Sequence, residues 1–297
     1  MFASFIMAGR KQAAFFVLLT TLLSLIFPPV SIFSGAAIAL ITLKISWQQG
    51  LLYSLIGSLV LATVTYLLKQ DASLGFFAGF IGWLPIVLFA TILAQTQSWR
   101  STLQAVLTTA VLGVLLFHAY QVDTISFWQN SLERVKPAIA EAYQLGNEQA
   151  DELIQNLSKW MTGVFAALIA ISSILVVLLA RHWQAMLYNV GGFGKEFRQL
   201  RVGLVPAIIV VFCIVVAILS KNTLAIEILI VAVCIFMLQG IALVHGIVKQ
   251  QGMKPYWLVG LYVLLFIMLP QMTVLLAAFG IIDNFVDFRQ KLAMKSD

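Results

Sequence analysis

The sequence predicts an all-α, polytopic transmembrane helical bundle of about nine spans. Of its 297 residues, 61% are hydrophobic and only 10% are charged, whereas soluble domains carry about 25% charged residues. Inside a bilayer the backbone must close its own hydrogen bonds, which only helices and closed barrels achieve. The apolar runs are long and do not alternate, so a barrel of short strands is excluded.

The expected spans are the apolar runs that approach the roughly 20 residues a helix needs to cross the bilayer. Pro28 and Pro29 separate the first two runs, because a helix cannot continue through that pair. Pro270 divides the last run, which is either one kinked helix or a hairpin. The runs are 12–27, 30–47, 51–68, 74–94, 103–120, 161–180, 204–220, 224–248 and 256–282.

These runs divide the chain into three parts. Residues 1–120 form N-terminal transmembrane helices, and 161–297 form C-terminal ones with a cytoplasmic, Gly-rich basic loop at 181–203. Residues 121–160 form an extracytoplasmic amphipathic segment, whose apolar residues recur at the spacing of two helices. This segment is expected to cap the bundle or lie on the headgroups. The alternative is a docking surface or a lid over a cavity.

Basic residues predict the orientation, because short loops rich in Lys and Arg stay in the cytoplasm. The loop at 181–203 has the strongest basic cluster, and placing it inside also places Arg10 and Lys11 inside. The N-terminus is therefore expected in the cytoplasm. A hairpin at Pro270 would bring Arg289 and the basic tail, including Lys295, to the same side, and we favour that arrangement.

Three glycines between positions 191 and 194 invite comparison with phosphate-binding loops. Those loops follow a strand, whereas this one links two membrane helices, so a nucleotide site is not expected. The glycines more plausibly allow a tight turn before a short basic amphipathic helix. Its aromatic residues would enter the membrane interface and its basic residues would meet anionic headgroups, or the helix would contact a cytoplasmic protein. These residues are Phe193, Lys195, Phe197, Arg198 and Arg201.

Ionisable groups within the spans are few, and each costs at least about 2.5–3.5 kcal/mol at the bilayer centre. Glu227 lies about one turn into the eighth run. It is either a ligand or proton site or an interfacial carboxylate paired with a neighbour such as Lys221. Gln239 and Gln271 lie deeper and are uncharged. Glu227, Gln239 and Gln271 are therefore the candidate ligand-binding residues, and coupled ion transport is disfavoured.

No motif predicts a reaction, a metal site or a cofactor. The three histidines lack metal-binding spacing. Cys213 and Cys234 lie in apolar runs and are expected to be inert. Basic residues occur singly at the ends of apolar runs, so nucleic acid is not an expected partner. The GxxxG pattern at 75–79 predicts close helix packing or an oligomer face.

Two segments carry a resemblance to a known family. The stretch from Arg181 to Asn189, with the Gly-Gly-Phe and Glu-Phe-Arg that follow, resembles the YybS-like family of bacterial membrane proteins, a domain of unknown function. The ending from Gly280 to Arg289, including Asp287, resembles it too. The resemblance implies a bacterial cytoplasmic-membrane protein. It also implies distant similarity in fold to the S components of energy-coupling-factor transporters and to the rod-shape protein MreD.

The expected function is that of a non-catalytic inner-membrane scaffold or accessory subunit of an envelope complex. The alternative is an S-component-like protein that binds and transports a small molecule. An enzyme acting on lipid-linked substrates is the third class, but no converging polar residues support it. Expected partners are membrane lipids, a membrane protein or second copy, and a small ligand. The residues expected to contact a partner or lipid are Phe193, Lys195, Phe197, Arg198, Arg201, Asp287 and Arg289.

Overall fold

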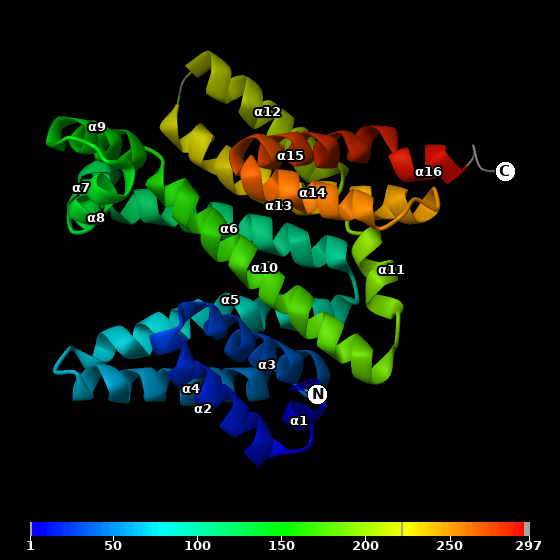
Figure 1. Cartoon of the computed structure of the whole chain (residues 1–297), viewed down its shortest axis with the longest axis horizontal. Helices are drawn as coiled ribbons and strands as arrows, with labels where there is room; N and C mark the ends of the chain where they lie inside the picture. The colour runs from blue at the N-terminus through cyan, green and yellow to red at the C-terminus, as the bar shows by residue number, and fades with distance from the viewer. Residues whose placement is uncertain (1, 221, 294–297) are drawn as a thin grey trace. The chain divides into compact units, whose positions relative to one another are not determined.

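The computed structural model describes residues 2–220 and 222–293, and these are helical throughout apart from short connections, with no strand (Figure 1). Six helices are long and apolar enough to cross a membrane, and three apolar stretches are shorter. The predicted all-α membrane bundle is therefore confirmed. The six long helices are α4 (Trp47–Leu67), α5 (Ala72–Thr96), α6 (Trp99–Tyr120), α10 (Met161–Tyr188), α13 (Thr223–Gln250) and α15 (Leu269–Val286).

Shorter helices complete the expected runs. The predicted first run corresponds to α2 (Arg10–Ile26), and the second to a 3-10 turn (Pro28–Val30) followed by α3 (Ser31–Lys44). The helix therefore ends at the Pro28-Pro29 corner, as the sequence predicts. The remaining helices are α1 (Phe2–Met7), α7 (Thr124–Glu133), α8 (Lys136–Tyr143), α9 (Asn147–Ser158), α11 (Gly192–Arg198), α12 (Leu204–Ser220), α14 (Tyr256–Ile267) and α16 (Phe288–Ala293).

The chain divides into two compact units. Unit 1 contains residues 1–106 and 171–201, and unit 2 contains residues 107–170 and 202–297. The division crosses α6 and α10. A long helix can contribute its two halves to different packing environments, and hydropathy does not report where such a change occurs.

The core of unit 1 is α3. Every residue from Ser34 to Leu43 is buried, although the helix has only 14 residues, about 21 Å at 1.5 Å per residue. Small residues let neighbouring helices approach it closely. A Cβ added at Gly35 would lie 3.0 Å from Val176 and 3.1 Å from Ile86. Protein therefore surrounds residues 34–43 of α3, so this buried stretch needs no match to the bilayer thickness.

The core of unit 2 contains the crossing of α13 and α15. A Cβ at Gly240 would collide with the backbone carbonyl of Leu276, and a Cβ at Gly280 would collide with that of Phe236. The two backbones therefore touch, as small residues allow in membrane helix pairs. Phe236 is fully buried beside this crossing.

The last apolar stretch forms a hairpin. It breaks at Met268 into α14 and α15, with Pro270 in the first turn of α15. Figure 1 shows α15 turning back along α14. Gln250 Nε2, at the end of α13, donates a hydrogen bond to the carbonyl of Arg289 in α16 at 3.2 Å. These contacts agree with the expected hairpin, whereas Lys295 lies outside the described residues.

The segment at 121–160 contains three helices, α7, α8 and α9, and not the two that were expected. The turn at Arg134 and Val135 interrupts the first predicted helix, and Pro137 occupies the first turn of the next one. A proline there lacks only an N–H that would be unpaired anyway, so the chain restarts readily at this point. Trp128 Nε1 donates to Thr162 Oγ1 at 2.8 Å and so ties α7 to the start of α10.

Candidate functional site: a clamped membrane-surface segment

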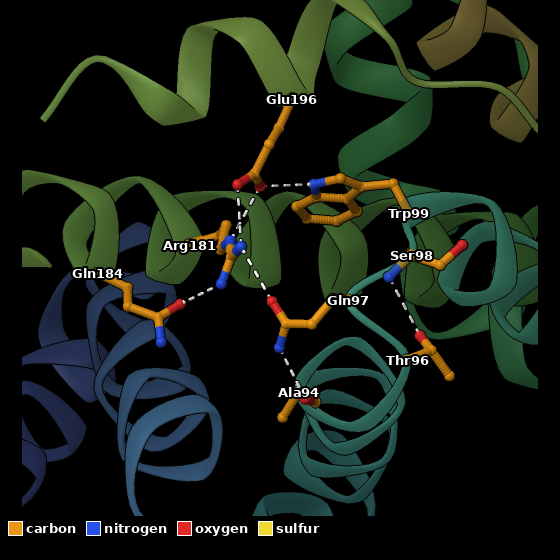
Figure 2. Close-up of polar contacts among 8 residues, drawn as sticks. All are labelled: Ala94, Thr96, Gln97, Ser98, Trp99, Arg181, Gln184 and Glu196. Carbon is orange, nitrogen blue, oxygen red and sulfur yellow. Dashed lines mark hydrogen bonds and ion pairs between the residues drawn. The ribbon is translucent and has the colours of Figure 1, made fainter. Parts of the chain in front are cut away.

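An arginine–carboxylate pair joins α10 to α11. Arg181 Nε and Nη2 donate to the two oxygens of Glu196, each at 2.9 Å. Figure 2 shows the guanidinium of Arg181 between Glu196 and Gln97, with the indole of Trp99 directed at the same carboxylate. Trp99 Nε1 donates to Glu196 Oε2 at 3.2 Å. We call Arg181, Glu196 and Trp99 the clamp. The two hydrogen bonds from Arg181 fix both the distance and the relative orientation of the guanidinium and the carboxylate.

Two amides complete the surroundings of the guanidinium. Nη1 of Arg181 donates to Gln184 Oε1 at 2.7 Å, and Nη2 donates to Gln97 Oε1 at 3.3 Å. Gln97 ends α5 in the left-handed conformation, and its own Nε2 donates to the carbonyl of Ala94 at 2.7 Å. The clamp thus ties α11 to α10 and to the turn between α5 and α6.

The electrostatics of the clamp follow from burial and pairing. Burial alone raises the pKa of the Glu196 carboxyl, but the hydrogen bonds from Arg181 and Trp99 and the positive charge of Arg181 outweigh it. The pKa of Glu196 consequently lies below its ordinary value. The carboxylate therefore stays ionised, and the clamp stays closed, at neutral pH.

The sequence directs α11 into this position. Gly191 adopts φ +82° at the turn after α10, a conformation that costs glycine little. Phe193 then packs its ring edge-on against His182 at a centroid distance of 5.1 Å and stacks on Phe197 at 6.0 Å. Both phenylalanines are half-buried, so their rings pack partly within the protein.

The helix α10 continues eight residues beyond the predicted end of its span. The expected loop at 181–203 therefore begins with a helix that runs to Tyr188. The charge of Arg181 indicates where the chain leaves the hydrocarbon, but it does not interrupt a helix. The helix ends at Tyr188, three residues before Gly191 adopts a positive φ.

This extension leaves large apolar side chains exposed beyond the ion pair. Met186, Tyr188 and Val190 are 50%, 52% and 87% exposed, and Lys195 is exposed on α11. We call residues 186–199 the docking segment. Because they follow Arg181, these side chains lie at the polar end of α10.

We expect acid to break the Arg181–Glu196 pair only when the pH falls below the ordinary pKa of a glutamate side chain. A carboxyl with a depressed pKa contributes stability above its unfolded pKa of about 4.3 and loses it as the pH falls through the lower folded value. We expect hydrogen-exchange protection of α11, corrected for intrinsic rates, to persist from pH 7 to pH 5. It should fall below about pH 4. The Glu196→Gln variant should lack this acid transition, and a loss of protection already at pH 6 would contradict the assignment to Glu196.

A second polar cluster connects α13 to α15 within unit 2. Gln239 is buried; its Oε1 accepts from the Val202 backbone N–H at 2.7 Å, and its Nε2 donates to Asp283 Oδ2 at 3.3 Å. Asn284 Oδ1 accepts from the Gly203 N–H at 3.1 Å. The cluster holds the start of α12 against the α13–α15 pair. A buried polar group needs such partners, so the cluster has a structural role.

Arg289 belongs to this cluster. Its Nη2 lies 3.6 Å from Asp283 Oδ2, and its side chain is 16% exposed. It was expected as a surface contact, but the structure directs it at a buried carboxylate. Asp287 ends α15 in the left-handed conformation. Arg201 and Arg198 are half-buried. A role in partner or lipid contact stays a prediction for these residues.

The third cluster is a close contact between a histidine of α6 and a carboxyl group of α13. Glu227 is 1% exposed, and its Oε2 lies 2.5 Å from Nε2 of His118, whose side chain is 27% exposed. Gly163 of α10 lies against the backbone of Glu227, since a Cβ there would be 2.6 Å from its Cα. The predicted neighbour Lys221 lies outside the described residues.

The structure does not gather the three ligand candidates around one cavity. Glu227 and Gln239 lie twelve positions apart on α13 and have separate partners. Gln271 is exposed in the first turn of α15. Their ligand-binding role stays a prediction. Within the described residues there is no group of three or more His, Cys, Asp or Glu side chains that could hold a metal ion.

The sequence did not single out several residues of these clusters. Trp99, Gln97 and His118 have partners between 84 and 109 positions away in the chain. The only sequence signal was the presence of polar or amphipathic side chains at the ends of apolar runs.

The helices and the buried polar clusters define a multi-pass helical membrane protein. A family profile described as "Predicted membrane protein (DUF2232)" matches residues 13–284. The chain belongs to this family. No curated protein and no solved structure matches it.

Proposed function

We propose that this protein is a non-catalytic docking subunit, a scaffold or accessory component of a complex in the bacterial cytoplasmic membrane. The docking segment would bind the partner. The observation that carries the proposal is the clamp, which holds α11 by two charge-assisted hydrogen bonds at 2.9 Å while leaving Val190 and Lys195 exposed.

The chemistry of the docking segment supports a protein partner. Tyrosine and methionine are enriched in protein interfaces, and exposed apolar groups among polar ones commonly mark binding surfaces. A segment that is already ordered loses less conformational entropy on binding. Lys195 adds a positive charge, so the partner surface is expected to be acidic.

The orientation and the class of partner are parts of the proposal. The excess of basic residues in the 181–203 region supports a cytoplasmic docking segment and a cytoplasmic N-terminus. The resemblance to MreD supports membership of an envelope complex. The intramembrane polar groups Glu227, Gln239 and Asp283 have partners within the protein, which supports a binding role over a catalytic one.

The test is co-purification in mild detergent from the native host with matched variants. Val190→Asp places a charge in the docking segment at a position that is 87% exposed, so folding should be unaffected. Val122→Asp makes the same change at a position that is 97% exposed, outside the docking segment. Disrupting an interface hot spot costs about 2 kcal/mol or more. We therefore expect recovery of a stoichiometric partner to fall at least about tenfold in Val190→Asp alone. Equal recovery from both variants would refute the docking role.

The second candidate is the binding of a small molecule, as the resemblance to S components implies. The buried contact of Glu227 with His118 favours it, because buried ionisable groups in membrane proteins commonly mark functional sites. A metabolite that co-purifies with the wild type and is lost in Glu227→Gln, with no protein partner recovered, would support this candidate.

A further inference from the structure

A small pocket lies within unit 1 where α2 begins and α3 passes into α4. Its volume is about 280 Å³. The wall is apolar and well ordered by packing, since Ile6, Ala13 and Ile41 are 1%, 4% and 0% exposed. The pocket is separate from the docking segment and from the three polar clusters.

Polar groups surround the same pocket. Arg10, Ser46, Gln49 and Tyr53 contribute to its lining. The Tyr53 hydroxyl donates to the backbone carbonyl of Arg10 at 3.2 Å, which holds the start of α2 against α4. This hydrogen bond holds the backbone of Arg10 beside the pocket.

The guanidinium of Arg10 is available to a ligand. Arg10 is exposed, as is the adjacent Lys11. Among the residues that the structure describes, none accepts a hydrogen bond from the Arg10 side chain or forms an ion pair with it. An apolar pocket with an unused arginine at its mouth suits a ligand that has an anionic head and an apolar body.

The surrounding side chains place the pocket at the membrane interface. Trp47, immediately after Ser46, is 46% exposed, and Ile45 is 58% exposed. Exposed tryptophans concentrate at the level of the lipid headgroups. The exposed Trp47 therefore supports a place for the pocket at the level where phospholipid headgroups meet the hydrocarbon.

We propose that this pocket binds the headgroup of one anionic phospholipid, with the phosphate on Arg10. Ligand pockets commonly range from about 300 to 1,000 Å³, so this smaller one suits a glycerophosphate group whose acyl chains remain in the bilayer. Lys11 adds a second attractive charge. The guanidinium geometry favours phosphate, which it binds through two parallel hydrogen bonds.

The test is native mass spectrometry of the full chain after removal of endogenous lipid in a neutral detergent. The protein is incubated with phosphatidylglycerol or with phosphatidylcholine at equal concentrations. We expect one phosphatidylglycerol to be retained preferentially. Arg10→Gln should weaken its retention about fivefold, the effect of one cation near an anionic lipid. Phosphatidylcholine retention should not change.

Two controls identify the site and the source of the phosphate. Lys69→Gln removes an exposed positive charge beyond the opposite end of α4 and should leave retention unchanged. Excess glycerol 3-phosphate should not displace the lipid if its chains contribute to binding. Equal weakening by Lys69→Gln, no effect of Arg10→Gln, or displacement by glycerol 3-phosphate would each overturn the assignment.

Discussion

Replacement of Gly240 by alanine is expected to lower the free energy of unfolding by about 3 kcal/mol. The added methyl group would collide with the backbone carbonyl of Leu276, and its distance to the carbonyl carbon would be 2.6 Å. A backbone in α15 cannot rotate away as a side chain could, so the two helices must separate. Their separation would also disturb the cluster that contains Gln239 and Asp283. Titration with a denaturing detergent, followed by circular dichroism, measures the loss.

Gly260→Ala is the matched control for this prediction. Gly260 also lies in a helix of unit 2, but nothing is within 4 Å of the position that its Cβ would occupy. Alanine is the better helix former by about 1 kcal/mol, so this variant should be neutral or slightly stabilised. Equal stability of the two variants would show that α13 and α15 do not cross as closely as described.

Replacement of Arg181 by alanine is expected to release α11. It removes two charge-assisted hydrogen bonds from Glu196, whose side chain is only 27% exposed. Leaving such a group without its partner costs about 2–3 kcal/mol. Trp99 alone would remain as a donor to the carboxylate. Hydrogen exchange of the α11 amides measures the loss as a lower free energy of local opening.

The double-mutant cycle isolates the coupling within the clamp. Arg181→Ala combined with Glu196→Ala also removes the stranded carboxylate, so the double variant should be less perturbed than the sum of the single ones. Arg181→Lys keeps the charge but loses the bidentate geometry, and it should give an intermediate loss. Strict additivity of the two alanine variants would contradict the clamp.

Hydropathy was sufficient to predict the apolar helices because it distinguishes segments that lie in lipid from segments that lie in water. All nine apolar runs correspond to observed helices, and Pro28 and Pro270 mark two of the breaks. The apolar run ended at residue 180, whereas α10 continues to Tyr188. Leaving the membrane and ending a helix are different events. The first depends on polarity, and the second depends on residues such as Gly191.

The partners within the clusters could not be predicted in the same way. Arg181 and Glu196 are 15 positions apart, and His118 and Glu227 are 109 apart. Such pairs depend on which helices become neighbours, and helix periodicity does not encode that. The sequence singled out Glu227 and Gln239, and it offered Lys221 as a neighbour of Glu227. It did not indicate the contacts with His118 and Asp283 that the structure shows. Segment 181–198 contains both ends of the Arg181–Glu196 pair, and segment 280–289 contains both ends of the Asp283–Arg289 pair.

Under the proposed function, the clamp holds residues 186–199 in position for a protein partner. The most direct measurement places a photo-reactive amino acid at Val190 in cells and compares otherwise wild-type protein with the Arg181→Ala background. We predict one dominant protein cross-link in the first case and a loss of at least about tenfold in the second, as expected when a preordered segment is released. Equal cross-linking in both backgrounds, or cross-links to lipid alone in both, would contradict the claim.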